Sequence, residues 1–137
     1  MLPESLNRLL ILRMSALGDI INALHVLGPL RRRYPDARIG WVVDDRFRDL
    51  FDSVPGVDDV IAFPRRAWGA TIRNPLRWPA LVVEGRDWFA RLRGSGYEAA
   101  LDLQGNAKSA FVLWGAGIPI RIGFDAAASR DGAHRSA

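Results

Sequence analysis

Short apolar runs alternate with amphipathic helical patterns along most of this sequence, and that alternation limits the folds open to it. Residues 9–14 (LLILRM) are an apolar run before a Ser/Gly turn, which is typical of a buried parallel strand. From Leu17, apolar residues recur at helical spacing as far as the arginines at 31–33, and Pro29 predicts a kink near Gly28. The N-terminal segment therefore predicts a strand, a turn and a helix.

The same order continues toward the C-terminus. The pattern predicts further strands at residues 38–43, 57–63, 97–103 and 118–124, and helices at 46–52, 79–92 and 107–114. Residues 64–78 hold two prolines and a glycine and show no clear period, so we expect a long, irregular loop there. Strands alternating with helices predict right-handed crossovers and a parallel sheet covered on both faces. The predicted fold class is α/β, with a Rossmann-like, doubly wound sheet.

Length and composition narrow the class of protein further. A chain of 137 residues with 49% hydrophobic content fits one domain, placed here at residues 1–125, followed by a polar tail at 126–137. The absence of cysteine excludes disulfides and thiol catalysis, and a cytoplasmic location is the default expectation. The N-terminus lacks the early positive charge of a signal peptide, and the longest uncharged run, residues 109–120, is too short to cross a bilayer.

Positive charge is concentrated in one segment of the chain. Residues 64–96 carry seven arginines against two acidic residues, and they include three of the five tryptophans, Trp68, Trp78 and Trp88. Basic and aromatic side chains together suit an anionic, partly apolar partner, such as a phosphorylated lipid, a membrane interface or single-stranded nucleic acid. The alternative is an ordinary solvated and partly packed face.

In a doubly wound sheet, ligands are expected beyond the carboxyl ends of the first and fourth strands, where the strand order reverses. The first of these loops, residues 15–19 (SALGD), has one glycine, so it is neither a G-x-G-x-x-G fingerprint nor a P-loop. It offers Asp19 near a helix start, which favours the ionised carboxylate and suits a proton acceptor at neutral pH. The alternative is that Asp19 only caps the helix.

The second loop, residues 104–108 (QGNAK), carries polar groups suited to a charged or sugar ligand. Lys108 is the only lysine beside eighteen arginines, and its flexible ammonium can reach a phosphate or carboxylate. Gln104 and Asn106 offer amide groups for sugar hydroxyls, or else they close the turn. If the topology is as predicted, the two loops converge.

The sequence gives no sign of a metal site. His25 and His134 have no metal-ligand spacing, and the D-x-D triplet found in many metal-dependent sugar transferases is absent. The adjacent acidic pairs at residues 44–45 and 58–59 lie beside predicted strands, and we interpret them as solvated turn charges. No metal and no cofactor are therefore expected.

Taken together, several motifs resemble those of a known family. They are residues 13–20 (RMSALGDI), 33–37 (RYPDA), 41–47 (WVVDDRF), 60–61 (VI), 65–68 (RRAW), 102–110 (DLQGNAKSA) and 121–125 (RIGFD). In this order they resemble the opening half of the ADP-heptose:lipopolysaccharide heptosyltransferases, glycosyltransferase family 9. The type that adds the first heptose to the Kdo sugar is the most similar, and the resemblance covers residues 9–133.

The resemblance implies that this chain is the N-terminal, acceptor-side half of a GT-B fold, whose C-terminal half would bind ADP-heptose. Asp19 would be the general base in an inverting, metal-independent transfer of heptose to Kdo-lipid A. The acceptor-binding residues implied are Arg13, Ser15, Arg65, Arg66, Gln104, Lys108 and Arg130. The cations among them would pair with carboxylates or phosphates of a lipid-linked anionic sugar, met at the cytoplasmic face of the inner membrane, and no nucleic acid is then expected.

The chain departs from the family pattern in its first helix, at Asn22, His25 and the Gly28-Pro29 pair. It also lacks the expected donor half, so we expect no turnover from these 137 residues alone. Two alternatives stay open. One is a non-catalytic module that binds anionic glycolipid or nucleic acid through residues 64–96, and the other is a GT-B enzyme for another sugar.

Overall fold

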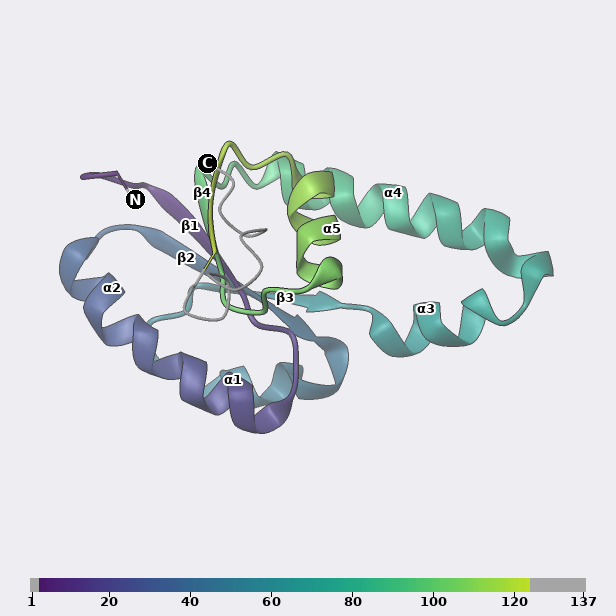
Figure 1. Ribbon diagram of the computed structural model, residues 1–137, viewed down its shortest axis with the longest axis horizontal. Helices are drawn as coiled ribbons and strands as arrows, with labels where there is room; N and C mark the ends of the chain where they lie inside the picture. The colour runs from purple at the N-terminus through teal and green to yellow at the C-terminus, as the bar shows by residue number, and fades with distance from the viewer. Residues whose placement is uncertain (1–2, 124–137) are drawn as a thin grey trace.

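A five-stranded parallel sheet with helices on both faces forms the computed structural model, which describes residues 3–123 (Figure 1). The strands are β1 (Arg8–Leu12), β2 (Arg38–Asp44), β3 (Asp59–Phe63), β4 (Ala99–Asp102) and β5 (Ile120–Gly123). Their order is β3-β2-β1-β4-β5, and every neighbouring pair is parallel. The Rossmann-like sheet is thus confirmed, and its strand order reverses between β1 and β4, as the sequence predicts.

The helices connect the strands in the expected sequence, with three 3₁₀-helices marked η. They are α1 (Leu17–Ala23), η1 (Leu24–Val26), α2 (Leu27–Arg33), η2 (Asp45–Ser53), α3 (Arg65–Ile72), η3 (Pro75–Arg77), α4 (Trp78–Gly94) and α5 (Ala107–Ala116). The predicted kink in the first helix appears as η1, just before Pro29. A proline ring clashes with the carbonyl four residues earlier, here that of His25, so the regular α-helix is interrupted at that point.

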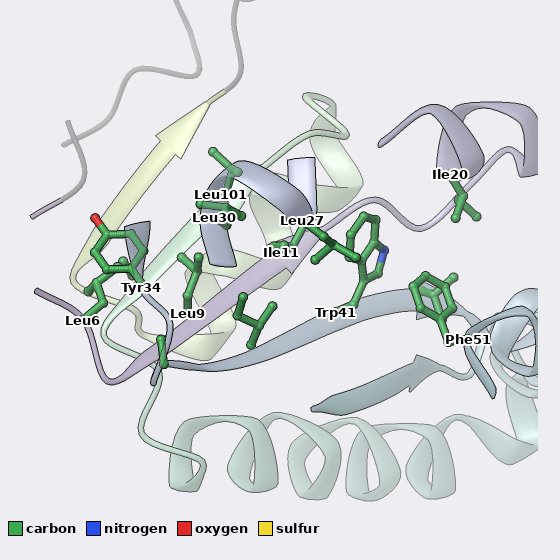
Figure 2. Packing of buried hydrophobic residues seen from close by; sticks show 14 residues of the cluster. Leu6, Leu9, Ile11, Ile20, Leu27, Leu30, Tyr34, Trp41, Phe51 and Leu101 are labelled. Atoms are coloured by element: carbon green, nitrogen blue, oxygen red, sulfur yellow. The ribbon is translucent and has the colours of Figure 1, made fainter. Parts of the chain in front are cut away.

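Buried side chains form two groups, one on each face of the sheet. In β1, Leu9 and Ile11 belong to the group under the helices between β1 and β3, whereas Leu10 and Leu12 belong to the group under α4 and α5. Figure 2 shows the first group, in which the ring of Trp41 lies 5.2 Å from that of Phe51. Because β1 is buried on both faces, its sequence after the exposed Arg8 is one continuous apolar run and shows no alternation.

The prediction of a loop at residues 64–78 was wrong, because α3 and η3 occupy most of it. The prolines stand where they start helices: Pro64 precedes α3, Pro75 opens η3 and Pro79 lies in the first turn of α4. Only Trp68 anchors α3 inward, with its ring 5.2 Å from Phe63, and one anchor gives no periodic signal. In Figure 1, α3 and α4 form a hairpin that projects away from the sheet.

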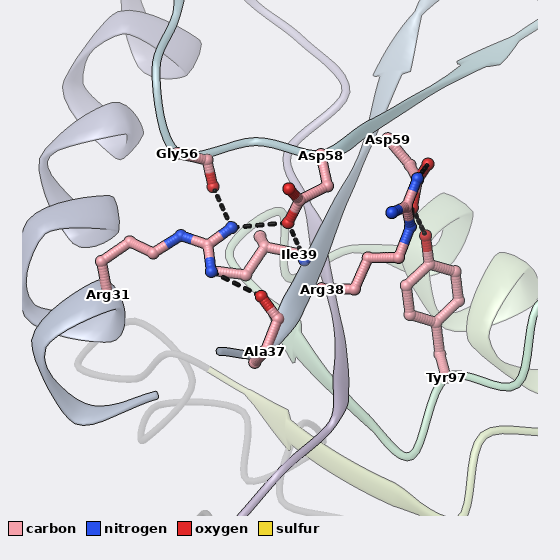
Figure 3. A network of polar contacts seen from close by, with 8 residues as sticks. All are labelled: Arg31, Ala37, Arg38, Ile39, Gly56, Asp58, Asp59 and Tyr97. Atoms are coloured by element: carbon pink, nitrogen blue, oxygen red, sulfur yellow. Dashed lines mark hydrogen bonds and ion pairs between the residues drawn. The ribbon is translucent and has the colours of Figure 1, made fainter. Parts of the chain in front are cut away.

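The acidic pair at residues 58–59 is also less solvated than predicted, because it ties β2 and β3 together at their amino ends (Figure 3). Asp58 accepts hydrogen bonds from Arg31 and from the backbone N–H of Ile39, at 2.5 and 2.8 Å. Burial alone would raise the pKa of Asp58, but these donors outweigh it and hold the pKa below its usual range. Asp59 pairs with Arg38 at 2.7 Å, so both members of the acidic pair have a structural role.

Close packing beside this network makes Gly40→Ala a strongly destabilising change. A Cβ atom on Gly40 would lie 2.1 Å from the hydroxyl oxygen of Tyr97, whose ring crosses β2 there. We expect Gly40→Ala to lower the free energy of unfolding by about 1–3 kcal/mol, because either the ring or β2 must shift. Gly69→Ala on α3 is the matched control, since a Cβ atom on Gly69 would have nothing within 4 Å. Equal denaturation midpoints for the two variants would contradict this packing.

Candidate functional site

The loops after β1 and β4 meet at the carboxyl edge of the sheet, as predicted. The side-chain oxygen of Gln104 accepts hydrogen bonds from the backbone N–H groups of Met14 and Ser15, at 3.0 and 3.4 Å. The backbone N–H of Leu103 donates to the carbonyl of Leu12 at 2.9 Å. Gln104 therefore uses its oxygen to hold the two loops together, and only its amide nitrogen is left for a ligand.

Asp19 lies in the first turn of α1, but it does not cap that helix. The N-cap residue is Ala16, and the cap has no side-chain hydrogen bond. Asp19 is instead 2.5 Å from Arg13, and its side chain is 59% exposed. Arg13, itself mostly buried, donates a second hydrogen bond to the carbonyl of Leu103 at 2.7 Å, so its guanidinium is fixed from both sides. The result is an exposed carboxylate with a defined orientation.

A cavity of about 470 Å³ opens beside this carboxylate. It is lined by Arg13, Asp19, Asn22 and His25, together with apolar side chains that include Leu103. A hollow of this size is in the range of small-ligand sites, and it presents a carboxylate, a guanidinium, an amide and an imidazole to its contents. Such a set can bind a hydroxylated ligand and accept a proton from it.

Side-chain hydrogen bonds hold the rest of the loop after β4 in a rigid conformation. Asp102 is buried and accepts hydrogen bonds from the backbone N–H groups of Gln104 and Gly105 and from the hydroxyl of Ser109, all at 2.9–3.0 Å. Asn106 caps α5 in a reciprocal box with Ser109. For Asn106, the structure favours the turn-closing alternative over ligand binding. Asp102, Asn106 and Ser109 thus hold Lys108 at the start of α5.

A second cluster of charges forms around Asp44, and the prediction that Asp44 is a solvated turn charge was wrong. Asp44 ends β2, one residue further than predicted, and its side chain is 0% exposed. Its carboxylate is 3.1 Å from a terminal guanidinium nitrogen of Arg46 and 3.4 Å from Nε of Arg65. Burial alone would raise the pKa of Asp44, but the hydrogen bonds from Arg46 outweigh it and lower that pKa, so the group is ionised.

Lys108 belongs to this second cluster and does not pair with Asp19. Its Nζ lies 5.7 Å from the centroid of the Phe63 ring, and Phe63 is the register partner of Asp44 in the sheet. Burial lowers the pKa of Lys108, and the charges of Arg65 and Arg46 lower it further, against the opposite pull of Asp44. Lys108 and Asp19 still follow strands that end at the same edge of the sheet, as the sequence predicts.

The predicted site residues therefore fall into two groups. Arg13, Ser15, Asp19 and Gln104 surround the junction of β1 and β4, whereas Arg65 and Lys108 join Asp44 and Arg46 at the ends of β2 and β3. Arg66 is exposed, and only its backbone N–H contacts the second group, at Asp45. Arg130 and the predicted tail lie outside the described residues. The sequence signal for Asp44 and Arg46 was weak, because the other members of the cluster, Arg65 and Lys108, lie on α3 and α5, far along the chain.

Two further observations bear on partners. Within residues 3–123, no helix is both long and apolar enough to cross a membrane. In the same part of the chain, no group of three or more His, Cys, Asp and Glu side chains is placed to hold a metal ion.

Comparisons with known proteins point to one family. The sequence model of glycosyltransferase family 9 (heptosyltransferase) matches residues 86–135. Lipopolysaccharide heptosyltransferase 1 of Campylobacter coli is 34% identical over 77% of this chain and 27% of its own length. Lipopolysaccharide heptosyltransferase 1 of Pseudomonas aeruginosa is 31% identical over 90% of this chain and 34% of its own length.

A solved structure agrees with these relatives. Escherichia coli heptosyltransferase WaaC with ADP superimposes with a TM-score of 0.70 and 26% identity, over 86% of this chain and 36% of that one. The chain therefore spans about a third of the length of the proteins it matches. Sequence motifs, fold and relatives agree, and the chain belongs to glycosyltransferase family 9, the heptosyltransferases.

Proposed function

We propose that this chain is the acceptor-side half of an enzyme that transfers heptose from ADP-heptose to Kdo-lipid A in lipopolysaccharide core assembly. Family membership and the relatives named heptosyltransferase 1 support the reaction class. The observation that carries the proposal is Asp19, an exposed carboxylate fixed by Arg13 at the edge where a doubly wound sheet binds ligands. The donor would be bound by the two thirds of the relatives' length that this chain does not span.

In this mechanism, Asp19 acts as the general base. Its carboxylate accepts the proton of an acceptor hydroxyl while the hydroxyl oxygen forms a bond to the anomeric carbon of heptose. The bond from that carbon to the diphosphate breaks at the same time, and ADP leaves with the electron pair. Arg13 holds the carboxylate in place. We propose that the step uses no metal ion and no cofactor, as the family resemblance implies.

We propose that the acceptor's anionic groups are bound by Arg65, Arg66 and Lys108, and that Arg130 contributes from outside the described residues. The half-exposed side chain of Arg65 and the partly buried Lys108 support this, because both present positive charge at the carboxyl edge of the sheet. Ser15 and Gln104 would line the cleft beside Asp19. We retain the sequence-based view that nucleic acid is not a partner.

We further propose a peripheral contact with the cytoplasmic face of the inner membrane, made by the tip of the α3–α4 hairpin. At the tip, Leu76 is 89% exposed, and Ile72 and Trp78 are at least half exposed. Arg73 and Arg77 lie between these apolar residues and are exposed as well. Apolar, indole and guanidinium side chains on one projecting tip are the combination that favours an anionic membrane interface.

The reaction itself is tested by joining this chain to the C-terminal part of Pseudomonas aeruginosa heptosyltransferase 1. With ADP-heptose and Kdo-lipid A, the joined protein is expected to release ADP and form the heptosylated product, whereas the 137 residues alone give none. Transfer to a different acceptor, or of a different sugar, would favour the alternative GT-B enzyme. A joined protein that is folded and binds the glycolipid yet transfers nothing would favour a non-catalytic binding module.

A further inference from the structure

The charges around Asp44 do not balance. Arg46, Arg65 and Lys108 bring three positive charges, against the carboxylates of Asp44 and its neighbour Asp45. Within residues 3–123, Lys108 Nζ makes no hydrogen bond or salt bridge, and Arg65 uses only its Nε, at 3.4 Å from Asp44. The cluster thus has one cation in excess and N–H donors left over, which is the electrostatic requirement for binding an oxyanion.

The register of β2 and β3 explains why these charged side chains lie together. Asp44 and Phe63 are register partners at the ends of β2 and β3, and Arg46 and Arg65 each follow their strand end by two residues. Lys108, held at the start of α5, lies over the Phe63 ring. Three segments far apart in sequence therefore deliver one cation each to the same buried carboxylate.

The cluster also borders an apolar groove. A hollow of about 550 Å³ lies between α3 and α4, and Phe63 and Arg65 form its end nearest the cluster. Apart from Arg86, the remaining wall consists of apolar residues and glycines, among them Trp68, Ile72 and Val82. Arg65 therefore faces the charged cluster and the groove at once, so an occupant with an anionic end and an apolar body would satisfy both.

We propose that Arg46, Arg65 and Lys108 form one oxyanion site for the headgroup of an anionic amphiphile, whose apolar part lies in the groove between α3 and α4. Asp44 is the buried carboxylate that gathers the three cations. The inference rests on the proposed function only in naming the natural ligand, a lipid-linked acceptor. Neither Arg46 nor Asp44 is implied by the family resemblance.

The single lysine makes the site directly observable. Reductive methylation with ¹³C-formaldehyde labels Lys108 and the N-terminal amine, and the Lys108 signal is the one that disappears in a Lys108→Arg variant. Octyl phosphate is expected to shift the Lys108 signal saturably, with an affinity at least about tenfold higher than that of inorganic phosphate, because methylene groups become buried. Octyl glucoside, with the same tail and no charge, is expected to leave the signal in place.

Matched variants separate the parts of the site. Arg46→Met should weaken binding of both phosphates at least about fivefold, whereas Arg48→Met, on the same 3₁₀-helix but outside the cluster, should not. Val82→Ser should reduce the advantage of octyl phosphate over phosphate while leaving the affinity for phosphate unchanged. Asp44→Asn should move the titration of Lys108 to lower pH, since the carboxylate that favours the charged amine is gone.

Other outcomes would overturn the proposal. If the Lys108 signal does not respond to either phosphate in the folded chain, the cations do not form an oxyanion site. If both phosphates bind equally well, the groove does not hold the apolar part of the ligand. None of these readouts depends on heptose transfer, so a failure of the proposed reaction and a failure of this site can be told apart.

Discussion

Asp19→Asn is expected to lower the rate of heptose transfer by about 10²- to 10⁴-fold in the joined, full-length enzyme, with little change in melting temperature. An amide keeps the size of the carboxylate and can still accept a hydrogen bond from Arg13. It cannot take the proton of the acceptor hydroxyl. The loss should therefore appear in kcat, while KM for ADP-heptose changes little.

Two comparisons make this result specific. Asp49→Asn removes an exposed carboxylate of η2 that belongs to neither group of site residues, and it should keep normal turnover. If Asp19 only stabilised the N-terminus of α1 through its charge, Asp19→Asn would lower the free energy of unfolding by a few tenths to about 1 kcal/mol. The melting temperature would then fall accordingly. Near-normal turnover in Asp19→Asn, with an unchanged melting temperature, would remove Asp19 from the mechanism.

The second large effect is expected at the membrane. Leu76→Ser should weaken binding of the chain to vesicles of phosphatidylethanolamine and phosphatidylglycerol by about 10- to 100-fold, because burying a leucine side chain contributes about 1.5–3 kcal/mol. Leu76 is the most exposed large apolar residue described, so its replacement should not disturb folding. Co-sedimentation over a range of lipid concentrations measures the change.

The matched control is Trp114→Ser on α5, which removes an exposed apolar side chain (73% exposed) that is not part of the hairpin. It should leave vesicle binding almost unchanged. Replacing the anionic lipid by phosphatidylcholine should weaken binding of the wild-type chain, since Arg73 and Arg77 each contribute about 1 kcal/mol at an anionic surface. Equal binding of the wild type and Leu76→Ser would show that the tip does not enter the interface.

Much of the fold followed from the sequence because the signal was periodic and local. The apolar run before Ser15 and the helical spacing after Leu17 predicted β1 and the first helix, and the usual order of doubly wound sheets then predicted that the first and fourth strands flank the switch point. α4 was predicted, but α3 and η3 were missed because Pro64 and Pro75, although prolines usually interrupt helices, here stand where these helices begin. A helix held by one inward tryptophan, Trp68, leaves no period to detect.

The candidate site was predicted only in part, namely where its residues directly follow strands that local sequence patterns predict. Asp19 and Gln104 follow strand ends that the switch-point rule brings together, so their neighbourhood could be expected from topology alone. Asp44 could not, since an Asp-Asp pair after a strand looks the same whether it is solvated or buried. Its environment depends on Arg65, 21 residues away, and on Lys108, 64 residues away, and such distant partners are visible only once the strands are in register.

A pair of calorimetric titrations of the 137-residue chain tests directly whether this chain is the acceptor half of a heptosyltransferase. One uses Kdo-lipid A dispersed in detergent, and the other uses ADP-heptose. We expect saturable binding of the glycolipid and no measurable binding of the sugar nucleotide. Tight binding of ADP-heptose, with no binding of Kdo-lipid A, would contradict the proposed division of labour between the two halves.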